Sequence, residues 1–178
     1  LIEKYEYRND LILVVQLSEL AVTNSNLVHE LQKERGMSAG FISSAGKAFA
    51  GKIPGQRQLT DKQLNIYQRF ITENHLPDIF APKLRELNAQ LGRLNAIRSQ
   101  VDSLSISVAD EVAYYTELNK LLLTIVDETA KTGANQEIAI KAAAFSAFLQ
   151  LKERAGIERA VLSSTFGQAG FKPKVYAK

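Results

Sequence analysis

The sequence predicts an all-α protein, an elongated up-and-down helical bundle whose first and last helices are long. Glycine and proline are scarce, with 10 and 4 of 178 residues, so the chain has too few turn-forming residues for a sandwich or a barrel. Leucine and alanine, both strong helix formers, make up nearly a quarter of the chain. Apolar residues also recur at helical spacing between separated turn signals. Five helices with short connections account for this pattern.

The first predicted helix covers residues 3–49, a stretch without proline. Its apolar stripe has heptad-like spacing and consists of Leu13, Leu17, Leu20, Leu27 and Leu31. Asn24 lies in register within this stripe, where a polar residue often sets the register of packing. The turn after this helix is predicted from Gly46, Gly51, Pro54 and Gly55.

The second and third predicted helices cover residues 56–73 and 78–101. The inner stripe of the second comprises Thr60, Leu64, Tyr67 and Ile71. The third has a heptad seam of Leu84, Leu87, Leu91, Leu94 and Val101, in which Arg98 takes the skipped position. Pro77 separates the two helices, and Pro82 falls near the first turn of the third, where a missing N–H matters least.

The fourth and fifth predicted helices cover residues 108–131 and 135–166. Ser107 followed by Asp110 has the spacing of an N-terminal capping arrangement for the fourth. Gly133 is expected as its C-terminal cap, and Asn135 as the cap of the fifth. At 1.5 Å per residue, the first and fifth helices would be about 50–70 Å long.

Composition excludes several classes of function. The chain has no cysteine, which excludes disulfides, thiolate metal sites and cysteine nucleophiles. The net charge of +3 fits an anionic ligand but is too small to indicate a nucleic-acid partner. The longest apolar run, residues 11–15, is far shorter than the roughly 20 residues of a membrane span. With only His29 and His75 and no catalytic motif, we expect neither enzymatic activity nor a cofactor or metal site.

A short internal repeat occurs once in the first part of the chain and once near its end. Residues 33–44 and 152–164 both read Lys-Glu-Arg, then mostly small residues, an apolar pair and Ser-Ser. The first copy is followed by a turn and a helix, whereas the second is followed by Gly170 and Pro173 and then by the last residues. We therefore expect residues 1–178 to form one domain that is either truncated at its C-terminal end or completed by a second subunit.

The arginine of each Lys-Glu-Arg segment is a candidate binding residue. The helical neighbours of Arg35 are apolar or small: Val28, Leu31, Ser38 and Ile42. Those of Arg154 are Ala147, Leu151, Ile157 and Val161. A guanidinium turned into such a surface needs compensation, which leaves two alternatives. A nearby carboxylate, Glu34, Glu153 or Glu158, could pair with it, or a small planar anion could lie between the two arginines.

Two further features concern the space around these arginines. Gly36 and Gly40, with Ser38 between them, would let a neighbouring helix approach closely and leave room for a ligand of a few atoms. Ordinary close helix packing explains the same glycines. Arg159 shares a helix face with Lys152 and Gly156, and it either belongs to the same site or is simply solvated.

At residues 29–41, His-Glu-Leu-Gln-Lys-Glu-Arg-Gly-Met-Ser-Ala-Gly-Phe, the sequence resembles the nitrate- and nitrite-sensing domain family. The resemblance continues at residues 55–61, 114–119 and 152–160, in the expected order. It implies an all-helical sensor domain of the kind found in bacterial chemoreceptors, sensor kinases and antitermination regulators. It also implies that Arg35, Arg154 and Arg159 bind the ligand. Gly36 and Ser38 complete the expected binding residues, because they leave space for it.

From this resemblance we expect the ligand-binding sensor of a bacterial transmembrane receptor of the chemotaxis type. In this expectation the domain is periplasmic, is flanked by transmembrane helices, forms a homodimer and has no nucleic-acid partner. Nitrate or nitrite would bridge inward-facing arginines and displace the helices. The alternative function is a helical dimerisation or partner-binding module without a small-molecule ligand. The alternative location is cytoplasmic, if the domain belongs to an antitermination regulator.

Overall fold

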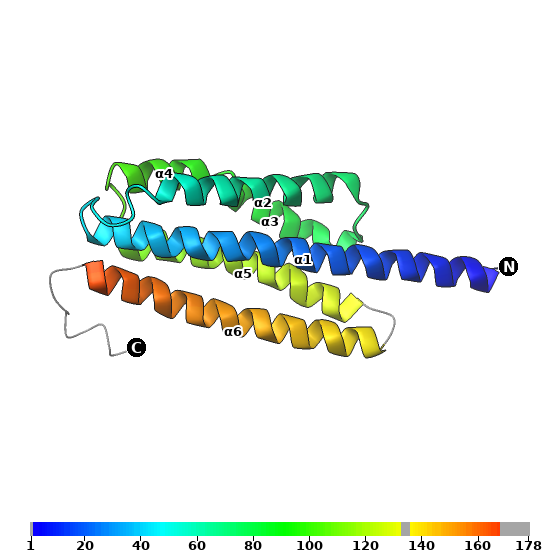
Figure 1. The fold of residues 1–178 in the computed structure, drawn as a ribbon. Coiled ribbons are helices and arrows are strands. Elements are labelled where there is room, and N and C mark those ends of the chain that lie inside the picture. Colours follow the sequence, from blue (N-terminus) through cyan, green and yellow to red (C-terminus); the bar gives the residue numbers. More distant parts are fainter. Residues whose placement is uncertain (1, 133–135, 168–178) are drawn as a thin grey trace.

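The computed structural model describes residues 2–132 and 136–167 of the chain, and within these ranges it contains helices and no strands (Figure 1). The predicted all-α bundle with long first and last helices is confirmed. The elements, in chain order, are α1 (Ile2–Ser43), α2 (Ile53–Glu73), the 3-10 turn η1 (Asp78–Phe80), α3 (Ala81–Leu91), α4 (Leu94–Asp102), α5 (Val108–Thr132) and α6 (Gln136–Gly167).

Helix α1 is the axis around which the bundle is built. It packs against α2, α5 and α6, while the short α3 lies against α5 (Figure 1). Its 42 residues correspond to about 63 Å of helix, and its N-terminal end extends past the neighbouring helices. None of the described helices combines the length and the hydropathy that a bilayer span requires.

The turn after α1 begins earlier than the sequence predicts. Helix α1 ends at Ser43 rather than residue 49, because Ala45, Gly46 and Phe49 have φ angles of 52°, 83° and 64°. These angles lie in the left-handed region, which is incompatible with a right-handed helix. Helix α2 in turn begins at Ile53 rather than residue 56, with Pro54 in the first turn, where its missing N–H leaves no hydrogen bond unmade.

The predicted third helix is divided into η1, α3 and α4. Gly92 and Arg93 separate α3 from α4, and the Arg93 N–H donates to the Gln90 carbonyl at 3.0 Å, three residues back rather than four. Glycine has little helix propensity, so this is where the helical ladder tightens. The apolar seam nevertheless continues across the break, since Leu91 and Leu94 are both buried.

The leucine stripe of α1 packs in the centre of the bundle. Leu20, Leu27 and Leu31 are completely buried and contact apolar residues of α5 and the other helices. Asn24, in the same stripe, is also fully buried, and its Nδ2 donates a hydrogen bond to the Leu122 carbonyl on α5 at 3.2 Å. This bond ties the register of α1 to α5 within one chain, as expected of a polar residue in an apolar seam.

The predicted cap of α5 is confirmed. The Asp110 N–H donates to Ser107 Oγ at 3.1 Å, and the Ser107 hydroxyl donates to Asp110 Oδ2 at 2.6 Å. Each side chain thereby supports the start of the helix. Four other residues named from the sequence lie outside the described residues: Gly133, Asn135, Gly170 and Pro173.

Candidate functional site

Arg35 lies in the interior of the bundle, where a carboxylate already neutralises it. Its side chain is completely buried, and its Nη1 donates to Glu153 Oε1 on α6 at 2.6 Å and to Thr116 Oγ1 on α5 at 2.9 Å. A second bond, from Nη2 to Glu153 Oε2, is 3.4 Å long. Of the two alternatives for Arg35, the structure contains the carboxylate. The Arg35 Nε has no hydrogen-bond partner among the described residues.

The Glu153 carboxylate on α6 accepts hydrogen bonds from two other helices, α1 and α5. Besides Arg35, Gln32 donates to its Oε2 at 2.6 Å and Asn119 donates to the same atom at 3.3 Å. Such additional hydrogen bonds offset part of the cost of taking the two charges out of water. This cluster of Gln32, Arg35, Asn119 and Glu153 therefore joins α1, α5 and α6.

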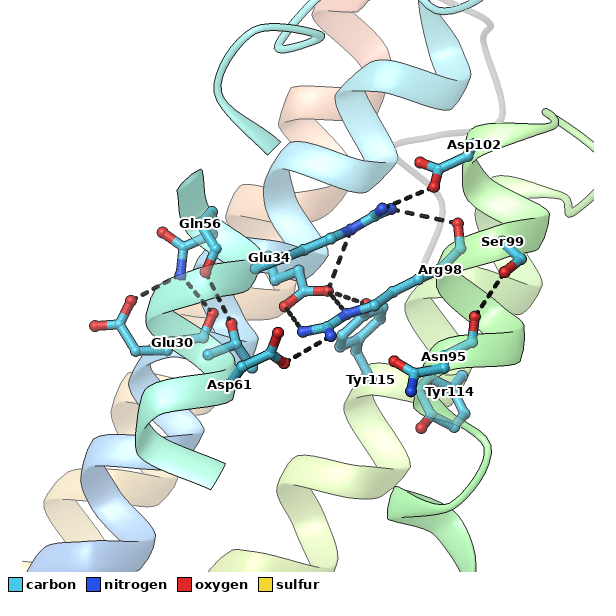
Figure 2. Close-up of polar contacts among 12 residues, drawn as sticks. Glu30, Glu34, Gln56, Asp61, Asn95, Arg98, Ser99, Asp102, Tyr114 and Tyr115 are labelled. Carbon is cyan, nitrogen blue, oxygen red and sulfur yellow. Dashed lines mark hydrogen bonds and ion pairs between the residues drawn. The ribbon is translucent and has the colours of Figure 1, made fainter. Parts of the chain in front are cut away.

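A second buried network surrounds Glu34, the neighbour of Arg35 in the chain (Figure 2). Arg98 on α4 forms a two-pronged ion pair with Glu34, with Nε–Oε1 and Nη2–Oε2 distances of 2.7 and 2.9 Å. The Tyr115 hydroxyl on α5 donates to Glu34 Oε1 at 2.8 Å, and Arg57 Nε on α2 is 3.8 Å from the same oxygen. Glu34 thus links α1 to α2, α4 and α5.

Outer carboxylates complete this network at the surface. Arg98 Nη1 donates to Asp61 at 2.7 Å, and Arg57 Nη1 donates to Asp102 at 2.8 Å. Burial disfavours the charged form of Arg98, yet the hydrogen bonds and charges of Glu34 and Asp61 raise its pKa above the ordinary value. Burial, reinforced by the charge of Glu34, likewise raises the pKa of Tyr115 well above its usual range. Both side chains keep their ordinary protonation state.

The expectation that Arg154 faces inward is wrong for this chain. Arg154 is exposed, and so are Leu151 and Val161 on its stripe. On α6 it is Glu153 and Gly156 that face α1, and successive helical residues are turned by about 100° from one another. Apolar spacing around Arg154 therefore marks a surface stripe, and the structure does not bring Arg154 and Arg35 together.

A small open pocket, of about 250 Å³, lies beside Arg35 between α1 and α6. Its lining includes Lys33, Gly36 and Met37 from α1, and Arg159 and Ser163 from α6. A Cβ on Gly36 would meet nothing within 4 Å, so this wall is open. A Cβ on Gly156, also in the lining, would lie 2.9 Å from Arg35 Nη2. The missing side chain of Gly156 therefore leaves room for the Arg35 guanidinium behind this wall of the pocket.

Positive charge gathers around this pocket. Lys33 and Arg159 line the pocket, and Lys152 and His29 lie close enough to interact with their charges. Glu30, the acid among them, pairs with Lys33, whereas Lys152 and Arg159 have no ion pair within the described part of the chain. Burial, together with the charges of Lys152 and Lys33, lowers the pKa of His29. Burial and the charge of Arg159 lower the pKa of Lys152. The cluster would accept negative charge from outside.

The structure thus divides the five sequence candidates. Gly36 and Arg159 line the pocket, Arg35 lies behind its Gly156 wall, and Arg154 is on another face. Ser38 is fully buried, and its hydroxyl has no hydrogen-bond partner in the described residues.

Sequence reasoning missed the buried network around Glu34. One signal for it was present: Arg98 interrupts an otherwise apolar heptad seam, and the structure buries it. The partners of Arg98, by contrast, are 37 and 64 residues away, on α2 and α1. No pattern local to any one helix identifies them.

Known proteins resemble this chain over most of its length. A family model described as "Nitrate and nitrite sensing" matches residues 26–178. A nitrate regulatory protein of Klebsiella oxytoca is 28% identical over 160 residues, covering 89% of this chain and 40% of that protein. The solved structure of the NasR transcription antiterminator matches with a TM-score of 0.87 and 26% identity, covering 94% of this chain and 46% of that one. The chain therefore spans less than half the length of each of these relatives.

Proposed function

The chain belongs to the nitrate- and nitrite-sensing family, and from this premise we propose that it binds a small planar anion, nitrate or nitrite, in the pocket between α1 and α6. Arg159 and Lys33 would supply the charge, and the open wall at Gly36 would supply the space. The proposed role is sensing, without catalysis.

The observation that carries this proposal is the unbalanced positive charge at the pocket. Lys33 has a partner in Glu30, at 3.1 Å, but Lys152 and Arg159 have no carboxylate partner in the described residues, and the pKa of His29 is lowered beside them. Like charges held together at a partly buried surface repel, and an anion between them removes this cost. A guanidinium also offers a planar fork of donors that matches a planar oxyanion.

The same pocket offers a route for a signal. Its walls belong to α1 and α6, so an anion held by Lys33 and Arg159 would draw these two helices together. The Arg35–Glu153 ion pair, which joins the same helices directly behind the pocket, would transmit this change to the bundle interior. The size of the response is limited by the difference in anion affinity between the two helix arrangements.

The relatives favour one biological context over another. The likeness to the NasR transcription antiterminator supports a sensor within a longer regulator of transcription, and with it the cytoplasmic location that the sequence analysis kept as its alternative. The periplasmic chemotaxis receptor with flanking membrane spans has no support from these relatives. We therefore infer an antitermination-type regulator as the parent protein.

A second candidate function, a partner-binding or dimerisation module, is favoured by the outer face of α6. Large apolar side chains are exposed along this helix: Ile140, Phe148, Leu151, Leu162 and Phe166. Exposed apolar rows of this kind are typical of interaction surfaces. The homodimer expected from the sequence stays a prediction, and this face is where we would place it. The two functions are compatible, because the pocket lies between α1 and α6.

Thermal unfolding with added anions tests the proposal. Nitrate, nitrite, formate and chloride are each titrated at constant ionic strength, and a ligand that binds the folded state alone raises Tm by mass action. We expect nitrate or nitrite to raise Tm, Arg159→Ala and Lys33→Ala to abolish the shift, and Arg154→Ala, an exposed arginine on the same helix, to retain it. Equal Tm shifts in all three variants would show that the anion binds elsewhere. If no anion shifts Tm, the partner-binding module is the better supported function.

A further inference from the structure

Glu111 is a buried acid without a hydrogen-bond partner. It lies in the first turn of α5, it is completely buried, and neither of its carboxylate oxygens has a partner among the described residues. An ionised carboxylate without hydrogen bonds is strongly disfavoured in such a place. The N-terminus of α5 favours negative charge, but this effect is small against the desolvation of a buried carboxylate.

The charged groups around Glu111 are already committed to other partners. From α1, Arg35 attracts the Glu111 carboxylate and Glu34 repels it. Arg35 is held by Glu153 of α6, while Glu34 is held by Arg98 of α4 and approached by Arg57 of α2. On α5 itself, Tyr115 donates its hydroxyl to Glu34. Glu111 is therefore an additional acid in a network whose arginines each have a carboxylate already.

The net effect on Glu111 favours its neutral form. Burial is the largest cause, Arg35 opposes it, and Glu34 adds to it, so that the pKa of Glu111 lies well above the ordinary value of 4.5. One donor nearby is unused, because the Nε of Arg35 has no acceptor in the described residues. An ionised Glu111 and the paired Glu153 would thus compete for one guanidinium.

We propose that Glu111 is a proton-binding site built into the sensor, neutral while Arg35 is paired with Glu153, and that loss of its proton draws Arg35 toward α5 and loosens the tie between α1 and α6. The proton moves between the Glu111 carboxyl and water, with no other reactant. Because the Arg35–Glu153 pair joins the two helices that carry the pocket, pH becomes a second input on the same helix pair. This inference concerns the free domain and does not depend on any anion being bound.

The sign of the pH effect follows from linkage. A carboxyl whose pKa is higher in the folded state than in the unfolded state binds more protons when folded. Its stabilising contribution is complete below the unfolded pKa, near 4.5, and is lost as the pH rises through the raised folded value. Glu111→Gln keeps the size of the side chain and removes the titration, so it removes this part of the pH dependence.

The experiment compares urea midpoints of the wild type and Glu111→Gln from pH 5 to pH 9. The matched control is Glu117→Gln, an acid on the same helix with a side chain that is 47% exposed. We expect the urea midpoints of the wild type and Glu117→Gln to fall as the pH rises. The midpoint of Glu111→Gln should fall less, so that this variant is the most stable of the three at pH 9. Parallel pH profiles for all three proteins would overturn the proposal.

Two measurements keep the test decisive if Glu111→Gln folds poorly. Infrared difference spectra of the wild type should show a protonated carboxylic acid at neutral pH that disappears as the pH rises. Hydrogen exchange of the α6 amides around Glu153, corrected for intrinsic exchange, should accelerate over the same pH range. A wild type with no protonated acid at neutral pH, or with α6 exchange that does not follow its titration, would contradict the proposal.

Discussion

Arg35 and Glu153, 118 residues apart, form a buried ion pair that joins the two Lys-Glu-Arg segments of the chain. The arginine comes from the first segment and the glutamate from the second, so the two copies do not act as equivalent arms of an arginine clamp. The second arginine, Arg154, is exposed instead. This pairing holds α1 against α6 at the level of the proposed anion pocket.

Removing one partner of this pair should be strongly destabilising. Glu153→Gln leaves the Arg35 guanidinium buried without a counter-charge, and we expect a loss of about 3–5 kcal/mol in the free energy of unfolding by urea denaturation. Glu158→Gln, an exposed glutamate on the same helix, should change it by less than about 0.5 kcal/mol. The double variant Arg35→Met, Glu153→Met should recover much of the loss, because no unpaired charge remains. A double variant as unstable as Glu153→Gln would show that the charge is not the cause.

Gly156→Ala should disturb Arg35 specifically. The new Cβ would lie 2.9 Å from Arg35 Nη2, and the guanidinium cannot retreat without stretching its bonds to Glu153 and Thr116. We expect a loss of roughly 1–3 kcal/mol, as in other overpacked sites. Gly36→Ala on the facing helix meets nothing within 4 Å and should stabilise α1 by about 0.5–1 kcal/mol. Thermal unfolding of both variants measures this difference in stability. An equal rise in Tm for both variants would refute the close approach at Gly156.

Glu34→Ala should create a site that small carboxylates can fill. The substitution removes the acceptor of Arg98 and Tyr115 and leaves a hole of carboxylate shape. We expect a loss of about 3–5 kcal/mol, with partial recovery of Tm in formate but not at equal chloride concentration. Asp61→Asn removes the other acid on Arg98, but its side chain is 49% exposed, so it should cost no more than about 1 kcal/mol. A formate effect of the same size in the wild type would mean that formate binds elsewhere.

His29 should report the charge of the pocket. Burial and the neighbouring lysines lower its pKa below the ordinary 6.5, so the unfolded chain binds more protons near that pH, and stability falls as the pH drops through and below 6.5. An anion held by Lys33 and Arg159 offsets those charges and should raise the pKa of His29. By the same linkage, the anion should bind more tightly at lower pH. Imidazole proton shifts in an NMR titration measure this, with exposed His75 as the reference in the same chain. A His29 titration that nitrate leaves unchanged would argue against the pocket.

Local signals in the sequence were sufficient for most of the helices. The leucine stripe of α1, the inner residues of α2 and the capping pair Ser107 and Asp110 all depend on interactions within a few residues. Such interactions are visible as spacing, and the structure agrees with them. The predicted helix boundaries are wrong where single residues change the backbone conformation, as at the left-handed residues after Ser43 and at Gly92. At these positions glycine indicates a weak point of the helix, but the sequence does not show whether the helix ends there.

The candidate site was predicted only in part. The sequence pointed to the two Lys-Glu-Arg segments and to Gly36, and these do surround the proposed pocket. It gave no means to distinguish Arg35, which is buried, from Arg154, which is exposed, because both have apolar neighbours at helical spacing. Nothing in the sequence distinguishes Glu111 from other acids, since an acid in the first turn of a helix is ordinary.

Amino-acid order alone determined that this chain forms long helices, where most of them run, and which family it resembles, because periodicity, caps and short motifs are all properties of neighbouring residues. Only the tertiary structure decided which acid meets which arginine. That choice depends on which helix faces come together and on which groups lose contact with water. A buried charge must find its partner among the residues that packing brings within about 3 Å, whatever their distance along the chain.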